Sequence, residues 1–270
     1  MTSSSAPASG DRIAKLDTNV PHSARIWNYW LGGKDNFAAD REVGDQVRAV
    51  FPHIVENARA SRAFLIRAVR HLAADQGIRQ FLDVGTGLPT ANNTHEIAQA
   101  VAPESRIVYV DNDPMVLAHA RALLNSSPQG ATDYIDADVR DTDTILREAA
   151  RTLDFARPVA LIMLGILGNI PDYDEAQSIV KRLVDGIPAG SYLVINDGTN
   201  TSHAIQEGAR VSSEGGHTYA LRSPEEITRF FDGLELLEPG VVSAPRWRPE
   251  SSGSGLPPEL DGYCGVARKP

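Results

Sequence analysis

The 270-residue chain contains a single cysteine, Cys264, so it cannot form an internal disulfide framework and fits a reducing compartment. No apolar run approaches the roughly 20 residues that a membrane-spanning helix needs. The first residues are small and polar and lack the apolar centre of a signal peptide. We therefore expect a cytoplasmic protein that does not associate with membranes and whose residues 1–16 form a disordered tail.

Basic residues are also scarce, since 26 lysines and arginines stand against 35 aspartates and glutamates, for a formal net charge of -9. An acidic protein repels a phosphate backbone, so we expect no nucleic-acid partner. The seven histidines show neither a His-x-x-x-His nor a cysteine-paired spacing, so we expect no metal site. A Gly-x-Ser-x-Gly elbow is absent too, and the sequence identifies no catalytic residue.

What the chain does have, 42% hydrophobic residues, suffices for one large α/β domain. From residue 80 onward the apolar spacing alternates between strand-like and helix-like periods, which predicts an α/β fold with a mostly parallel sheet. The predicted strands are 80–84, 106–111, 132–136, 158–164 and 190–196, and the predicted helices are 93–101, 114–124, 142–153 and 174–186.

The two ends of the chain add further elements. Residues 17–78 are mostly helical, and within 58–74 one helical face is apolar. The capping box Ser223-Pro-Glu-Glu226 predicts a helix to about residue 231. Two closing strands, within 234–247 with an interruption at Pro239-Gly240 and at 262–268, should form an antiparallel hairpin at one edge of the sheet.

Acidic residues close three successive strand-like runs: Asp83, Asp111 and Asp138. A parallel sheet needs such groups at its carboxyl edge to hold a nucleoside-bearing cofactor. Gly85 and Gly87, on either side of Thr86, allow a tight turn that a ligand can approach closely. The third glycine of the dinucleotide fingerprint is missing because proline and threonine follow, which argues against a docked pyrophosphate.

Each acid has a functional and a structural interpretation. Asp111 could accept hydrogen bonds from both ribose hydroxyls, or it could cap the helix that follows. Asp138 could accept one from an adenine amino group, with Ala137 and Val139 beside the ring, or it could be a solvated loop acid. Asp83 lies inside an apolar strand and needs partners, which a ligand ammonium group and the loop amides would supply, or it could be purely structural.

Three motifs carry a resemblance to a known superfamily: Leu82-Asp-Val-Gly-Thr-Gly-Leu-Pro89, Val110-Asp-Asn-Asp113 and Asp136-Ala-Asp-Val-Arg140. Together they resemble class I S-adenosylmethionine-dependent methyltransferases. The block Ser23-Ala-Arg-Ile-Trp-Asn-Tyr-Trp-Leu-Gly-Gly-Lys-Asp-Asn-Phe-Ala-Ala-Asp-Arg41 is similar to an actinobacterial S-adenosyl methyltransferase family, formerly a domain-of-unknown-function family. The similarity extends from about Thr18 to the end of the chain.

The resemblance implies a Rossmann-like sheet of seven strands in the order 3-2-1-4-5-7-6, with the last strand antiparallel. It implies S-adenosyl-L-methionine as the cofactor, with its methionine end over 83–87, its ribose on Asp111 and its adenine by Asp138. The expected cofactor-binding residues of the sheet are Asp83, Gly85, Thr86, Gly87, Asp111, Asn112, Asp138, Val139 and Leu164.

The 23–41 block favours a lid over the cofactor, because Gly32-Gly33 separates an aromatic helix from a polar stretch and could act as a hinge. Tyr29, Gly33 and Asn36 are then expected at the cofactor, with Tyr29 and Asn36 bonded to the methionine carboxylate. The alternative is a helix packed on the core with a turn at the glycines. We divide the chain into an N-terminal helical extension, 17–78, and a methyltransferase domain, 79–270.

Two further segments bear on the acceptor. Relatives tend to carry His-Phe-x-Pro-Asp after strand four, whereas this chain has Gly168-Asn-Ile-Pro-Asp172, so a histidine base at this position would be absent. The polar segment 200–222 would lie over the carboxyl edge and is our candidate for substrate contacts, although a solvated loop is the more ordinary interpretation.

We therefore predict an S-adenosylmethionine-dependent methyltransferase that acts on an unidentified small-molecule acceptor. Such chemistry depends mainly on positioning and on exclusion of water, so an inconspicuous catalytic residue does not count against it. One alternative is a catalytically silent regulatory protein that binds S-adenosylmethionine, which the glycine at 168 favours. A second is an NAD-dependent oxidoreductase, which the incomplete glycine fingerprint disfavours.

Overall fold

The computed structural model describes residues 16–123, 126–250 and 255–270, so the expected tail at 1–16 lies almost entirely outside the described residues. The helices are α2 (Ser23–Trp30), α3 (Ala38–Val50), α4 (Ile54–Ala74), α5 (Thr94–Val101), α6 (Pro114–Leu123), α7 (Thr142–Ala149), α8 (Tyr173–Asp185), α9 (His203–Glu214) and α10 (Pro224–Arg229). The strands are β1 (Gln80–Val84), β2 (Arg106–Asp111), β3 (Ala131–Asp136), β4 (Ala160–Leu164), β5 (Tyr192–Gly198), β6 (Glu235–Leu236), β7 (Val242–Ser243) and β8 (Gly262–Arg268).

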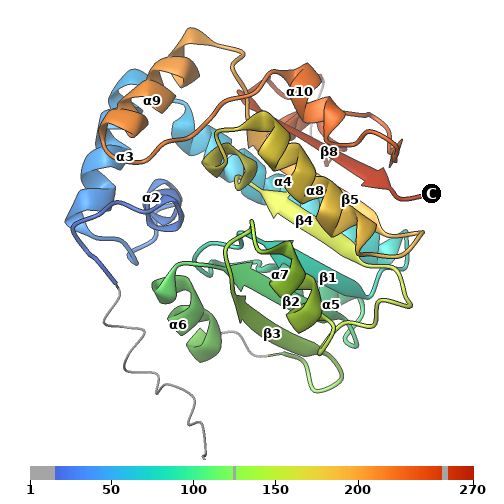
Figure 1. Ribbon diagram of the computed structural model, residues 1–270. Helices are drawn as coiled ribbons and strands as arrows, with labels where there is room; N and C mark the ends of the chain where they lie inside the picture. The colour runs from blue at the N-terminus through green and yellow to red at the C-terminus, as the bar shows by residue number, and fades with distance from the viewer. Residues whose placement is uncertain (1–15, 124–125, 251–254) are drawn as a thin grey trace, which may run out of the picture.

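A single sheet runs through the molecule in the order β3-β2-β1-β4-β5-β8-β6 (Figure 1). Strands β1 to β5 are parallel, and β8 lies antiparallel between β5 and the edge. The predicted order is confirmed, with one difference, because the predicted sixth strand consists of the short strands β6 and β7, which both pair with β8. Pro239 and Gly240, which has a φ of 85°, lie between them and end the first of the two.

The order of the strands reverses between β1 and β4, and a crevice forms at such a switch point at the carboxyl edge. Strand β1 pairs with β2 on one side and β4 on the other, and all five of its residues are buried. A parallel strand buried on both faces is a continuous apolar run, which explains why the sequence predicted the bounds of β1 and β2 correctly.

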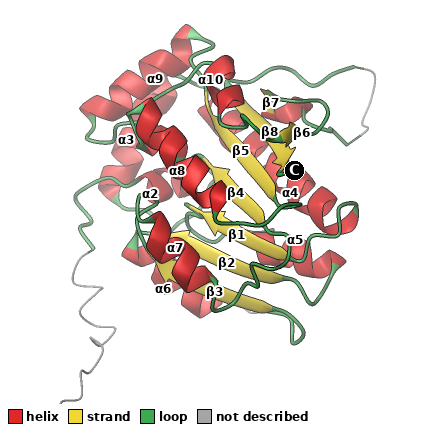
Figure 2. Cartoon of the chain, turned by 45° about the vertical axis from the view of Figure 1, so that its right-hand side comes forward, coloured by secondary structure: helices red, strands yellow, loops and turns green. Residues whose placement is uncertain are grey.

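Helices cover both faces of the sheet, with α7 and α8 on one face and α4 and α5 on the other (Figure 2). Side chains along β1 point alternately to the two faces of the sheet, so they belong to two core clusters. Leu82 and Val84 pack in the cluster under α7 and α8, and Phe81 packs in the cluster under α4. The predicted apolar face of α4 is confirmed, since Phe64, Leu65, Ala68, Val69 and Leu72 are all buried.

A third apolar cluster lies outside these layers and defines what we term the cap, formed by α2, α3 and α9 (Figure 1). Helix α3 packs along α9, although about 150 residues separate them in the sequence. The interpretation of 200–222 as a solvated loop was wrong, because 203–214 form a helix. Ser202 caps this helix, and Gly208 lets it approach α3 closely, since a Cβ there would lie 3.3 Å from Phe51 Cβ.

None of the helices in the described ranges combines the length and hydrophobicity needed to span a bilayer.

Truncation of the sheet core should destabilise the fold strongly. Leu161 on β4 is fully buried, so Leu161→Ala should lower the free energy of unfolding by about 2–5 kcal/mol, through lost burial and the cavity left behind. Leu256→Ala is the matched control, since that leucine is 74% exposed. Chemical denaturation of both variants measures the difference, and equal stabilities would contradict this placement of the core.

Candidate functional site

A cavity of about 400 Å³ lies between the carboxyl edge of the sheet and the cap. Its floor comes from the ends of β1, β2, β4 and β5, and its roof from α2, α9 and the first half of α4. Of the nine sheet residues expected at a cofactor, every one lines this cavity: Asp83, Gly85, Thr86, Gly87, Asp111, Asn112, Asp138, Val139 and Leu164.

The turn after β1 is held against β2 by its backbone. The Gly85 and Thr86 N–H groups both donate to the Val110 carbonyl, at 2.8 and 3.2 Å. Gly85 and Gly87 have φ values of 74° and 67°, which disfavour any residue with a Cβ. A Cβ at Gly85 would also lie 2.7 Å from Ile166, so the loop after β4 packs directly on this turn.

Asp111 connects the end of β2 to that turn. Its Oδ2 accepts a hydrogen bond from the Gly87 N–H at 2.9 Å, and its Oδ1 accepts one from the Asp113 N–H at 2.9 Å. Burial raises the pKa of the Asp111 carboxyl. The alternative role, capping the next helix, belongs to Asp113 instead, whose Oδ1 accepts from the Met115 N–H at 2.8 Å.

Asp83 is buried at the end of β1 with one side-chain partner, Thr94, whose hydroxyl donates to Oδ2 at 2.6 Å. Burial raises the pKa of Asp83 to about 6, although Thr94 and the charge of Arg62 oppose the rise. Such a carboxylate is costly to ionise, and a cationic ligand in the cavity would offset that cost. Thr94 is thus a structural partner that leaves room for a ligand role.

Asp138 lies across the cavity and is half-exposed. Its Oδ2 accepts from the Asn112 side-chain amide at 3.3 Å, and its Oδ1 accepts from the Arg140 N–H at 2.9 Å. Val139 follows it and is buried. The structure therefore brings a carboxylate, an amide and an apolar side chain together at the wall of the cavity.

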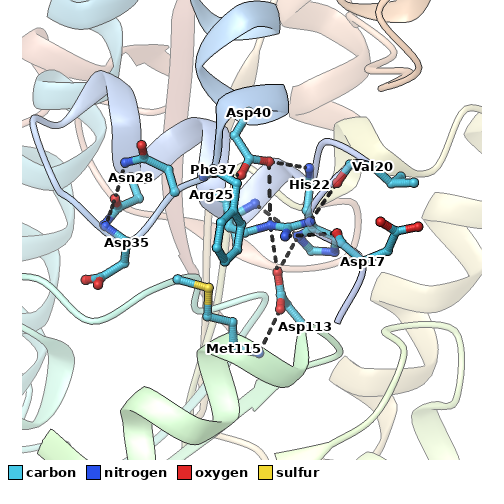
Figure 3. A network of polar contacts seen from close by, with 12 residues as sticks. Asp17, Val20, His22, Arg25, Asn28, Asp35, Phe37, Asp40, Asp113 and Met115 are labelled. Atoms are coloured by element: carbon cyan, nitrogen blue, oxygen red, sulfur yellow. Dashed lines mark hydrogen bonds and ion pairs between the residues drawn. The ribbon is translucent and has the colours of Figure 1, made fainter. Parts of the chain in front are cut away.

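A buried ion cluster connects the cap to the sheet, and no sequence pattern indicated it. Figure 3 shows the Arg25 side chain between Asp40 and Asp113, with Nε 3.5 Å from Asp40 Oδ1 and 3.6 Å from Asp113 Oδ2. His22 Nδ1 lies 3.0 Å from the same Asp113 oxygen, and the His22 N–H donates to Asp40 at 2.9 Å. The side chains of Arg25, Asp40 and Asp113 are at most 4% exposed.

The sequence analysis also did not single out Asp197, a further buried carboxylate at the end of β5. Its Oδ2 accepts from the N–H groups of Leu167 (2.9 Å) and Gly168 (3.2 Å), and its Oδ1 from Gly198 (3.1 Å) and the Tyr219 hydroxyl. Burial raises the pKa of Asp197 to about 6. The sequence signal that could have found it is its position, because Asp197 directly follows the predicted strand 190–196.

The three residues expected from the N-terminal block do not line the cavity. The Tyr29 hydroxyl donates to Asp45 at 2.7 Å on the surface, and the Asn36 amide donates to Asn28 Oδ1 and the Gly33 carbonyl, both at 3.0 Å. These bonds engage the Tyr29 hydroxyl and the Asn36 amide within the N-terminal helices, outside the residues that line the cavity.

The histidines form no metal centre, and among the described residues no group of three or more metal-ligating side chains occurs. His217 lines the cavity, and burial lowers its pKa to about 4, which keeps it neutral.

Known proteins resemble the chain over nearly its whole length. The S-adenosyl methyltransferase family matches residues 9–270 of the chain. A DUF574-family protein from Streptomyces avermitilis is similar at 46% identity and a TM-score of 0.90, over 94% of this chain and 99% of its own. A candidate methyltransferase from Thermobifida fusca shares 44% identity with a TM-score of 0.87, over 94% and 96% of the two chains. No curated protein matches the chain.

A more distant structure resembles the chain in fold alone. It is a SAM-dependent methyltransferase from Anabaena variabilis, with 13% identity and a TM-score of 0.54 over 95% of this chain and 100% of its own.

Asp83 should make stability depend on pH. Because its pKa is higher in the folded state, the folded protein binds more protons between about pH 4 and 6, and stability falls as the pH rises through that range. Asp83→Asn should remove this loss and gain up to about 3 kcal/mol over wild type at pH 7, but nothing at pH 4. Denaturant titrations of the ligand-free protein at both pH values test this, and a constant difference would contradict it.

The ion cluster should contribute strongly to stability. Asp113→Ala leaves the Arg25 guanidinium buried with one carboxylate fewer, so it should cost about 3–5 kcal/mol of unfolding free energy. Asp174→Ala, at an exposed position of α8, is the control. Chemical denaturation gives both values, and a loss at Asp113 no greater than the control's would show that the cluster is dispensable.

Proposed function

The chain belongs to the S-adenosyl methyltransferase family, and we propose that the cavity at the carboxyl edge holds S-adenosylmethionine over β1 to β3 and a small-molecule acceptor beside it, over β4 and β5. The protein is a methyltransferase that uses S-adenosylmethionine, and its acceptor is unidentified. When bound, the cofactor supplies a methyl group on a positively charged sulfur. The chain therefore has to bind, orient and exclude water.

One observation carries the proposal, namely the Asp111 carboxylate held at the cavity wall by the Gly87 and Asp113 N–H groups. Each oxygen uses one lone pair on the backbone and keeps another for a ligand. Two ribose hydroxyls offer the two matching donors. The turn at 85–87, free of side chains at both glycines, then leaves its remaining surface to the methionine end of the cofactor.

The charges of the cavity favour a cationic cofactor. Asp83 and Asp111 are buried carboxylates, and we assign Asp83 to the region of the cofactor's ammonium group. Asp138 and Asn112 supply an acceptor and an amide for the adenine edge, and Val139 supplies an apolar wall for its ring.

The same features weigh against a dinucleotide. Residues 88–93 separate Gly87 from Thr94, where helix α5 begins, so the glycine turn does not lead directly into a helix as it does in the dinucleotide fingerprint. An anionic pyrophosphate would instead lie among carboxylates. We therefore retain S-adenosylmethionine and set aside the oxidoreductase.

The cap supplies the roof of the site. Trp27 on α2 and Leu31 at the C-terminal end of α2 both line the cavity. The ion cluster fixes α2 near β2. We propose that α2 excludes water from the reacting groups, without the direct cofactor contacts first expected of Tyr29 and Asn36. In functional terms the catalytic unit is α4 together with 79–270 except α9, and the cap is α2, α3 and α9. A cytoplasmic location stays a prediction from the sequence.

Calorimetric titration with S-adenosylhomocysteine tests the cofactor site. Asp111→Ala should weaken binding by about 1–3 kcal/mol, because the ligand hydroxyls lose their acceptors. Asp174→Ala should bind as wild type does. An unchanged dissociation constant in folded Asp111→Ala would contradict the ribose assignment, and binding of NAD in place of S-adenosylhomocysteine would contradict the function.

A further inference from the structure

One part of the cavity has an apolar wall that the cofactor proposal does not use. Ile205 and Leu221 converge over Gly198, where a Cβ would lie 3.5 and 3.1 Å from their methyl carbons. Phe51 and Ile54 belong to the same cluster and also line the cavity. We term this region, with Tyr219, the acceptor compartment.

The polar side chain of this compartment, Tyr219, is held by a buried carboxylate. The Tyr219 hydroxyl donates to Asp197 Oδ1, and the Gly198 N–H approaches the same phenolic oxygen at 3.4 Å. The ring lies over Gly168 so closely that a Cβ there would be 2.2 Å from Tyr219 Cζ. Glycine at 168 is therefore what allows this tyrosine to occupy its place.

The four donors around Asp197 decide the direction of the tyrosine proton. Three backbone N–H groups and one phenol use all four lone-pair directions of the carboxylate. Asp197 therefore has no free oxygen for a ligand, and it cannot pair directly with an ammonium group. Tyr219, by contrast, gives its proton to Asp197 and keeps acceptor capacity on its oxygen.

Packing contacts of the loop after β4 place Tyr219 near the methionine end of the proposed cofactor site. Ile166 packs against Gly85 of the glycine turn, and Gly168, two residues further, lies beneath the Tyr219 ring. The loop after β4 thus connects the turn and the tyrosine, and both line the same cavity.

We propose that the Tyr219 oxygen is the hydrogen-bond acceptor for the hydroxyl group of a neutral, mainly apolar acceptor molecule, and that Asp197 positions it. This inference rests on the proposed function. It names the substrate class as an alcohol or phenol on an apolar skeleton.

The charges around Tyr219 support a neutral molecule. His217 lines the same cavity, and it is neutral because burial lowers its pKa to about 4. Arg222 lies below but donates to the Leu167 and Ile170 carbonyls at 2.8 and 2.6 Å. Two other basic side chains of the cavity are also engaged, since Arg62 donates to the Ala91 and Asn92 carbonyls and His22 pairs with Asp113. A carboxylate or phosphate on the acceptor would compete with these partners for a cation, and burying it unpaired would be costly.

The proton movement balances without any further reagent. The acceptor O–H bond breaks, its electron pair stays on the acceptor oxygen, and the proton forms a new O–H bond on Tyr219. In the same movement Tyr219 passes its own proton to Asp197, which becomes neutral; Tyr219 later releases a proton to solvent and recovers its own from Asp197. The freed electron pair forms the bond to the methyl carbon, while the bond between that carbon and the cofactor sulfur would break with its electron pair left on the sulfur, so no external oxidant or reductant is needed.

A binding experiment tests this apart from turnover. The full-length protein is saturated with S-adenosylhomocysteine and titrated by calorimetry with 7-hydroxycoumarin and with coumarin, which lacks the hydroxyl. Wild type should bind 7-hydroxycoumarin about 3–10-fold more tightly, the worth of one hydrogen bond. Tyr219→Phe should bring the ratio to about 1 and leave coumarin binding unchanged.

Control variants separate this role from a structural one. Tyr192→Phe removes a hydroxyl bonded to Gln76 at the opposite end of β5, and it should keep the wild-type ratio. Gly168→Ala, which displaces the Tyr219 ring, and Asp197→Asn should lower the ratio as Tyr219→Phe does.

The outcomes are decisive in both directions. If wild type shows no preference for 7-hydroxycoumarin, or Tyr219→Phe retains it, the inference is overturned. Unchanged S-adenosylhomocysteine affinity in Tyr219→Phe shows that the cofactor site is intact, whereas failure of wild type to bind S-adenosylhomocysteine contradicts the proposed function instead.

Discussion

The cavity depends on the buried contact between Asp113 and Arg25. The sheet supplies the floor of the cavity, and its roof comes from helices that form no part of the sheet. Asp113 lies two residues after the strand-end acid that we assign to the ribose, and its N–H donates to that acid while its carboxylate faces Arg25. A single short segment therefore sets the position of the proposed ribose site and the position of the roof above it. Removing two charges from water is costly, so such a contact persists only where the geometry around it is fixed.

Most of the fold could be predicted from the sequence, because buried parallel strands leave a strong local signal. The bounds of β1 and β2 were predicted correctly, and the capping box at Ser223 marked the start of α10. Helix α9 was missed for a physical reason. Of its buried residues only Ile205 is large and apolar, whereas Gly208 and Ser212 are residue types that disfavour a helix interior. The partner that stabilises it is distant in the chain, and local sequence does not contain that information.

The candidate site likewise contains residues that local sequence predicts and residues that it does not. Residues at strand ends were predictable, because the position of a strand end follows from the sequence of that strand, and Asp83 and Asp111 lie where expected. The side-chain directions of Tyr29 and Asn36 depend on how α2 packs, and the expectation that they face the cofactor found no support in their hydrogen bonds. The ion cluster and the Asp197–Tyr219 pair join segments far apart in the chain. Contacts of this kind are set by tertiary packing alone.

The composition of the cap has a consequence for how this scaffold can diversify. Its helices come from two places, α2 and α3 ahead of the sheet and α9 between β5 and α10, and they form one apolar cluster. A chimera that exchanges only the first segment between homologues would mismatch the surface of α3 with a foreign α9. Grafting of acceptor preference should therefore require both segments to be moved together, and natural variation in them should be correlated.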